Sequence, residues 1–201
     1  AAVEENAEED FVEVVIDAGT PVAEALETRL KVSARVRIIL GPGHFRLTGR
    51  DLKIENEVEI QGAGPEDTEV EVDGIAVWNT FRARGVHFVR NNSSSYCISA
   101  ESSAVVCLEQ VKITAESPCH SFVGRQSSKF VSLRECCIPR PSMWLQSKRE
   151  PVTSHYEFED CAIGEISQDS SAEIKAIIEA MEMYDRCDEW TFSGALVKAA
   201  K

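Results

Sequence analysis

One feature constrains the fold of this chain more than any other: a short apolar pattern that repeats at a fixed interval. Four octets begin at residues 81, 106, 131 and 156, so each starts 25 residues after the one before, and they read FRARGVHF, VCLEQVKI, VSLRECCI and YEFEDCAI. Positions one, three, six and eight of every octet are apolar. Alternation predicts short β-strands, and the change of phase at positions four and five predicts a bend between two of them. A fixed period with apolar columns indicates a solenoid, because no repeat can bury its own apolar face alone.

The spacing inside the octets distinguishes between kinds of solenoid. Helical repeats need apolar spacings of three and four, and leucine-rich repeats need Asn or Cys in a Leu-rich frame; the octets have neither. Short strands rich in Val, Ile, Phe and Cys favour a parallel β-helix, whose turns stack about 4.8 Å apart. The pattern over residues 11–165 resembles the right-handed β-helix of the pectin-lyase-like superfamily. We therefore predict an all-β protein, a right-handed parallel β-helix with an N-terminal capping helix and a C-terminal amphipathic helix.

Pairs of the form apolar-x-apolar set the predicted number of turns at about six. These pairs stand at 36/38, 58/60, 86/88, 111/113, 136/138 and 161/163. Residues 1–10 carry five acids and no base, which predicts a solvated tail. The β-helix domain, 11–165, begins with a strand and a capping helix at 21–32, where Thr20-Pro21 forms a helix start. Residues 166–201 are predicted to hold a C-terminal helix, with a capping box at Ser170–Glu173, and a tail.

Composition narrows the classes of partner and compartment. The net charge of -13 argues against nucleic acid and anionic membrane surfaces, and no apolar run is long enough for a membrane span. The seven cysteines form no C-x-x-C pair, so we interpret them mainly as small buried hydrophobes and expect neither a metal site nor a cofactor. This use of cysteine weakly favours an intracellular or organellar compartment. The chain would have reached it with a targeting segment that was then removed.

Catalytic residues are not predicted. Polygalacturonases are enzymes of the superfamily that this chain resembles. Their motifs Asn-Thr-Asp, Gly-His-Gly and Arg-Ile-Lys do not occur in the chain. The outward residues on the strands that would carry the calcium-binding Asp residues of pectate lyases are His87, Lys112, Cys137 and Ala162. Glu135 and Asp160 fall one turn apart, near the spacing of a retaining glycosidase pair, but acids at such a corner are usually solvated surface.

The candidate binding residues form two groups. Arg84, His87, Lys112 and Arg134 make a basic area on an acidic protein, which favours an anionic sugar or an acidic partner. Position four alternates in charge through Arg84, Glu109, Arg134 and Glu159, which predicts a structural ladder of opposite charges. Trp190 and Phe192 offer apolar area for a protein partner.

Two functions are consistent with these observations. The first is a non-catalytic structural or interaction module, a subunit or scaffold in an assembly of other protein subunits, with no nucleic acid and no membrane insertion. The alternative is a carbohydrate-binding or polysaccharide-cleaving β-helix protein. A flat aromatic platform in an outward groove would favour the alternative.

Overall fold

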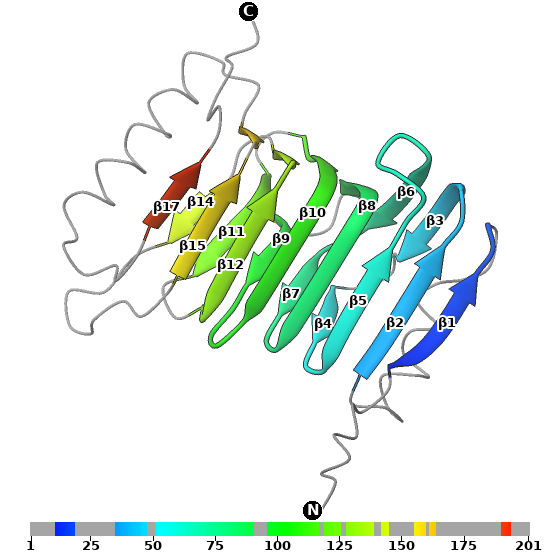
Figure 1. Ribbon diagram of the computed structural model, residues 1–201, viewed down its shortest axis with the longest axis horizontal. Coiled ribbons are helices and arrows are strands. Elements are labelled where there is room, and N and C mark those ends of the chain that lie inside the picture. Colours follow the sequence, from blue (N-terminus) through cyan, green and yellow to red (C-terminus); the bar gives the residue numbers. More distant parts are fainter. Residues whose placement is uncertain are drawn as a thin grey trace, which may run out of the picture.

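The computed structural model describes residues 11–18, 35–47, 51–90, 96–116, 119–125, 128–138, 142–144, 155–159, 161–163 and 190–193. They form an all-β parallel solenoid of about four turns (Figure 1). The prediction of a parallel solenoid is confirmed, and the prediction of six turns is not. None of the described segments is a helix, and so none has the length and apolar character that crossing a bilayer requires. The acidic tail at 1–10 and the helices predicted at 21–32 and after Ser170 lie outside the described residues.

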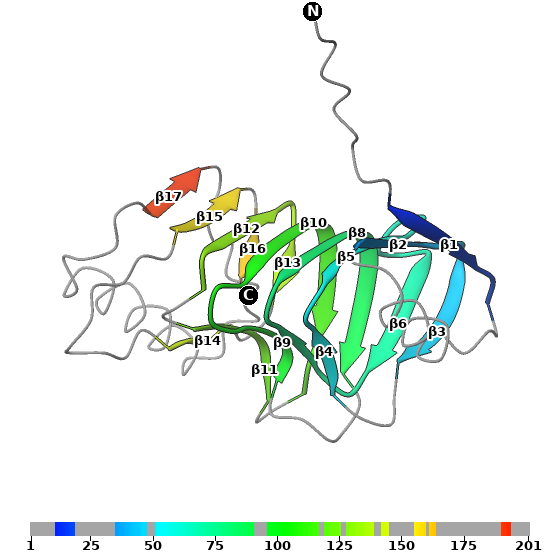
Figure 2. The ribbon, with the colours of Figure 1, turned by 90° about the horizontal axis from the view of Figure 1, so that it is seen from below.

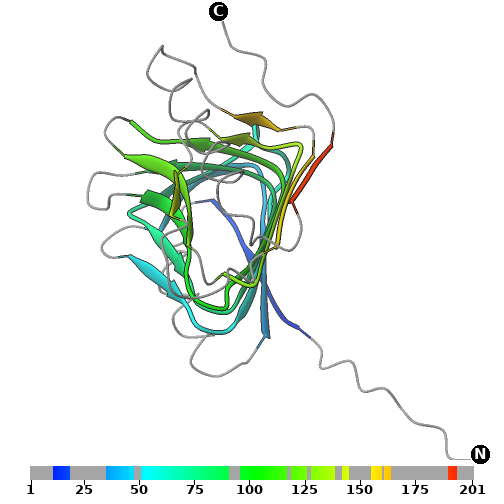
Figure 3. The ribbon, with the colours of Figure 1, turned by 90° about the vertical axis from the view of Figure 1, so that its left-hand side faces the viewer.

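The strands lie on a first, a second and a third face around the core (Figure 3). The first face holds, in spatial order, β1 (Val12–Ile16), β2 (Arg35–Leu40), β5 (Glu57–Gln61), the start of β8 (Thr80–Arg90), the start of β10 (Val105–Thr114), β12 (Phe130–Arg134), β15 (His155–Glu159) and β17 (Trp190–Ser193). The second face, which Figure 2 shows turned away from the first, holds β3 (Gly43–Leu47), β6 (Thr68–Val72), the ends of β8 and β10, β13 (Cys137–Ile138) and β16 (Ala162–Ile163). The third face holds β4 (Leu52–Ile54), β7 (Ile75–Val77), β9 (Tyr96–Ala100), β11 (His120–Arg125) and β14 (Ser142–Trp144).

The bend between the first and second faces falls at position five of the octets. Gly85, Gln110 and Glu135 have φ angles of 62°, 52° and 51°, in the left-handed region. Glycine adopts this conformation freely, whereas Gln110 and Glu135 do so at a cost of about 1–2 kcal/mol each. The bend lets positions three and six both face inward although they are an odd number of residues apart. The bend predicted from the change of phase in the sequence is thereby confirmed.

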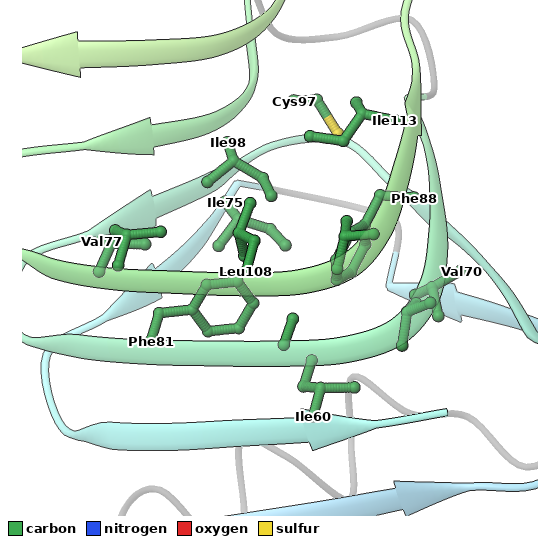
Figure 4. Close-up of a cluster of buried hydrophobic side chains, with 14 of the residues drawn as sticks. Ile60, Val70, Ile75, Val77, Phe81, Phe88, Cys97, Ile98, Leu108 and Ile113 are labelled. Atoms are coloured by element: carbon green, nitrogen blue, oxygen red, sulfur yellow. The ribbon is translucent and has the colours of Figure 1, made fainter. Parts of the chain in front are cut away.

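The inward columns of the octets form one continuous core (Figure 4). Column one (Phe81, Val106 and Val131) is fully buried, and the column-eight residues Phe88, Ile113 and Ile138 are buried in the same way. Cys136 and Cys161 occupy column six, where both are buried, and neither forms a disulfide. The predicted core positions are confirmed wherever the side chains are described.

The register of the early turns differs from the prediction. The apolar pairs predict that Val58 and Ile60 align with 86/88, yet Val58 lies beside Phe81 and Ile60 beside Ala83, in columns one and three. Columns six and eight are continued instead on β6, where Val70 pairs with Phe88. An apolar-x-apolar pair looks the same in either half of an octet, so the sequence pattern could not assign it. The hydrogen-bonded register does.

Candidate functional site

A ladder of alternating charges runs across the outer side of the first face. Backbone pairing aligns Arg84 with Glu109, Glu109 with Arg134, and Arg134 with Glu159. Arg84 Nε lies 3.8 Å from Glu109 Oε2, and Arg134 Nε lies 3.3 Å from Glu159 Oε2. The four side chains, from Arg84 to Glu159, are 63%, 39%, 53% and 48% exposed. We call them the charge ladder; its predicted order is confirmed.

Ion pairs also connect the turns at the N-terminal end of this face. Arg35 Nε lies 2.9 Å from Glu57 Oε2, and Glu57 also pairs with Arg82 on the opposite neighbouring strand. Arg37 Nε lies 3.0 Å from Glu59 Oε2. The guanidinium groups of Arg35 and Arg37 stack on the Phe11 ring, 4.3 and 4.7 Å from its centroid, and they bury part of that ring.

A hollow of 340 Å³ lies beside the charge ladder. Glu59, Arg82, Cys107 and Ser132 are aligned on four neighbouring strands, and the floor of the hollow lies over Cys107 and Ser132. Two small side chains in place of two long ones leave the space. Its lining mixes both signs of charge with small polar groups: Glu59, Gln61, Arg82, Arg84, Cys107, Glu109, Ser132 and Arg134, over Ala83 and Leu108. A surface of this kind suits polar contacts.

The predicted basic area is divided between two faces. Arg84 and Arg134 lie on the first face, whereas His87 and Lys112, which pair in register, lie on the second, beyond the bend. Each of these bases has an acidic neighbour. On the second face, Lys112 Nζ lies 3.3 Å from Glu66 Oε1, and His87 Nδ1 lies 3.5 Å from Glu69 Oε2. Together they form no single positive patch.

Glu69 on β6 contacts two histidines, one on each of the strands that flank β6. Its Oε1 lies 3.0 Å from His44 Nδ1 and its Oε2 faces His87, while His87 Nε2 is 2.8 Å from Thr114 Oγ1. Arg46 pairs with Glu71 in the next outward column, 2.7 Å apart. The pattern of the octets does not reveal these acids, because they lie in an earlier turn. A signal existed, because His44 and Arg46 precede Glu69 and Glu71 by the same 25 residues that separate the octets.

The pKa of His87 is lowered, first by burial, which disfavours the charged ring, and then by Lys112; Glu69 and Glu66 oppose the shift. The unfolded chain therefore takes up the proton first as the pH falls below about 6.5. We expect stability to fall over the window between that pH and the lower folded pKa. His87→Gln should make the loss between pH 7.5 and 5 smaller, as measured by urea unfolding at each pH. Equal losses in both proteins would contradict this role.

The remaining predicted residues are placed by register alone. In β17, Trp190 pairs with Tyr156 and Phe192 with Phe158, so both continue columns one and three beyond β15. They add a strand to the first face, separate from Arg84 and Lys112. β17 is the last strand in the described order and has one described neighbour.

The proposed carboxylate pair is only partly described. Glu135 Oε2 accepts a hydrogen bond of 2.9 Å from Gln110 Nε2, and Asp160 lies outside the described residues. Among the residues that the structure describes, no three His, Cys, Asp or Glu side chains gather as metal ligands would.

Comparison with known proteins adds no assignment: no protein-family model, curated protein or solved structure matches this chain.

Proposed function

We propose that this chain is a non-catalytic structural or interaction module, a subunit or scaffold in a protein assembly. The observation that carries the proposal is the use of the outward charges. On the first face Arg35, Arg37, Arg84 and Arg134 each pair with an acid on a neighbouring strand. Charges engaged in this way align the turns, each pair contributing a few tenths of a kcal/mol. They build a rigid surface and do not form an acid–base pair directed at a substrate.

The end strand β17 is the most suitable place for association with other subunits. An end strand presents unpaired backbone groups, and another chain can extend the sheet there. Trp190 and Phe192 add the residue types that dominate protein interfaces. At the fold level, we propose a right-handed coil of six turns with helical caps, as in the pectin-lyase-like superfamily. This proposal is supported by the first-face strands β2, β5, β8, β10, β12 and β15, which succeed one another in register.

Removal of residues 188–201 tests the proposal. We expect the shortened chain to keep its β-sheet circular dichroism and to lose at least half of the protein that co-purifies with the full chain from its source. A chain lacking only 194–201 retains β17 and is the matched control. Undiminished, stoichiometric co-purification with the shorter chain would contradict the role of β17. If no protein co-purified with the full chain in stoichiometric amount, the proposal that the chain is an interaction module would be contradicted.

The alternative is a carbohydrate-binding or polysaccharide-cleaving protein. It is favoured by Trp78, an outward aromatic ring that is 46% exposed. The same full chain, assayed on a panel of polysaccharides, distinguishes the two functions. Turnover that is abolished by Glu135→Gln together with Asp160→Asn would replace the module with an enzyme. Binding without turnover that is lost in Trp78→Ala would favour a lectin-like function.

A further inference from the structure

The outer side of β8, β10, β12 and β15 is open along the charge ladder. The exposures of its four side chains, between 39% and 63%, leave them accessible although each lies beside an opposite charge. Arg84 and Arg134 approach their acids through Nε, and each guanidinium carries five N–H donors, so each arginine has further donors to offer. The ladder therefore holds donors and acceptors for a second surface.

The order of the ladder has a particular symmetry. From β8 to β15 the signs are positive, negative, positive, negative. A second copy can face this surface after a half-turn about an axis parallel to the strands, between β10 and β12. The half-turn reverses the order of its strands, so Arg84 meets the second copy's Glu159 and Glu109 meets the second copy's Arg134. The reciprocal contacts follow, and all four face an opposite charge, as an isologous interface requires.

The same axis relates the neighbouring outward residues. Val105 and Phe130 are aligned on β10 and β12 and are half-buried, so the half-turn brings Val105 opposite Phe130 of the second copy. Cys107 and Ser132, also aligned on these strands, come opposite each other in the same manner. The hollow of each copy reaches the axis at Cys107 and Ser132, so the two hollows meet there and leave room for water, which interfaces commonly contain. About this one axis, apolar residues therefore face apolar residues and small polar residues face small polar residues.

We propose that the outer side of β8, β10, β12 and β15 is a two-fold interface with a second copy of this chain. The inference rests on the proposed function as an interaction module and names one of its partners. Self-complementary charge order favours a second copy over an acidic peptide, because Glu109 lies between the two arginines. The net charge of -13 opposes association at long range. Near 0.15 M salt the Debye length is about 8 Å, so this repulsion is screened more than the contacts are.

Complementary charge reversals test the interface. Glu109→Arg places two positive side chains opposite each other across the axis, twice per dimer, and Arg134→Glu does the same with negative ones. We expect wild type to dimerise in sedimentation equilibrium at 0.15 M salt, and each variant alone to bind itself at least about tenfold more weakly. When the two variants are mixed, the new arginine of one faces the new glutamate of the other, and heterodimers should form with near wild-type affinity.

Other outcomes overturn the proposal. They are a wild type that stays monomeric up to about 0.1 mM, either variant dimerising as wild type does, or folded variants whose mixture remains monomeric. Arg46→Glu on the second face is the matched control and should leave dimerisation unchanged. Circular dichroism and melting of each variant show that it is folded, since each also loses ion pairs within its own ladder. If dimerisation fails while loss of β17 still weakens association with other subunits, the inference falls and the proposed function stands.

Discussion

Replacing Phe88 with alanine is expected to lower the free energy of unfolding by about 3–5 kcal/mol, a large part of the stability of a single domain. Phe88 is fully buried in column eight, between Val70 and Ile113 on the adjacent strands. Its ring centroid lies 6.3 Å from that of Phe81, so the aromatic contact joins the first and second faces (Figure 4). Truncation would leave a cavity that strands fixed by pairing on both sides cannot close.

Urea unfolding followed by circular dichroism measures this loss. Val89→Ala is the matched control, because the neighbouring side chain in β8 lies in the outward column and is only half-buried. The control should change the free energy of unfolding by less than about 1 kcal/mol. A loss below about 1 kcal/mol for Phe88→Ala itself would mean that column eight does not face the core.

Gly62→Ala is expected to cost about 3 kcal/mol or more, because there is no space for a methyl group at this position. The Gly62 amide donates a 2.9 Å hydrogen bond to the Arg84 carbonyl, and the Gly64 amide donates one of 3.0 Å to the Gly85 carbonyl. A Cβ on Gly62 would lie 2.3 Å from the Gly85 oxygen and 2.9 Å from side-chain carbons of Thr68 and Val86. The nearest atom belongs to the backbone of the bend, which cannot move aside without breaking these hydrogen bonds.

Gly41→Ala provides the comparison. A Cβ there meets no atom within 4 Å, and the same substitution should be neutral or stabilise by up to about 1 kcal/mol through the unfolded state. Thermal melting of both variants, with urea titration for those that fold, gives the difference. Similar stability of the two variants would contradict the close approach of the Gly62 segment to the bend.

The solenoid and its later columns could be predicted from the amino-acid sequence alone. Phe81, Val106 and Val131 recur every 25 residues, and strands that pair in register must place equal positions of equal repeats side by side. The same spacing predicts the charge ladder, because outward residues at one position also stack. The bend was readable from the change of phase, since alternation cannot keep both halves of an octet facing inward without it.

The register of the early turns, which are joined by loops of unequal length, could be read from the folded chain and not from the sequence. The loops between the early strands differ in length, so the alignment of Val58 with Phe81 depends on backbone pairing and not on a constant spacing. The bend also separates Arg84 from His87, three residues along the chain, onto different faces, which divides the predicted basic area. Glu66 reaches Lys112 from 46 residues away. Such contacts depend on where the turns of the coil place segments that are distant in the sequence. A local pattern of apolar and polar residues does not specify that placement.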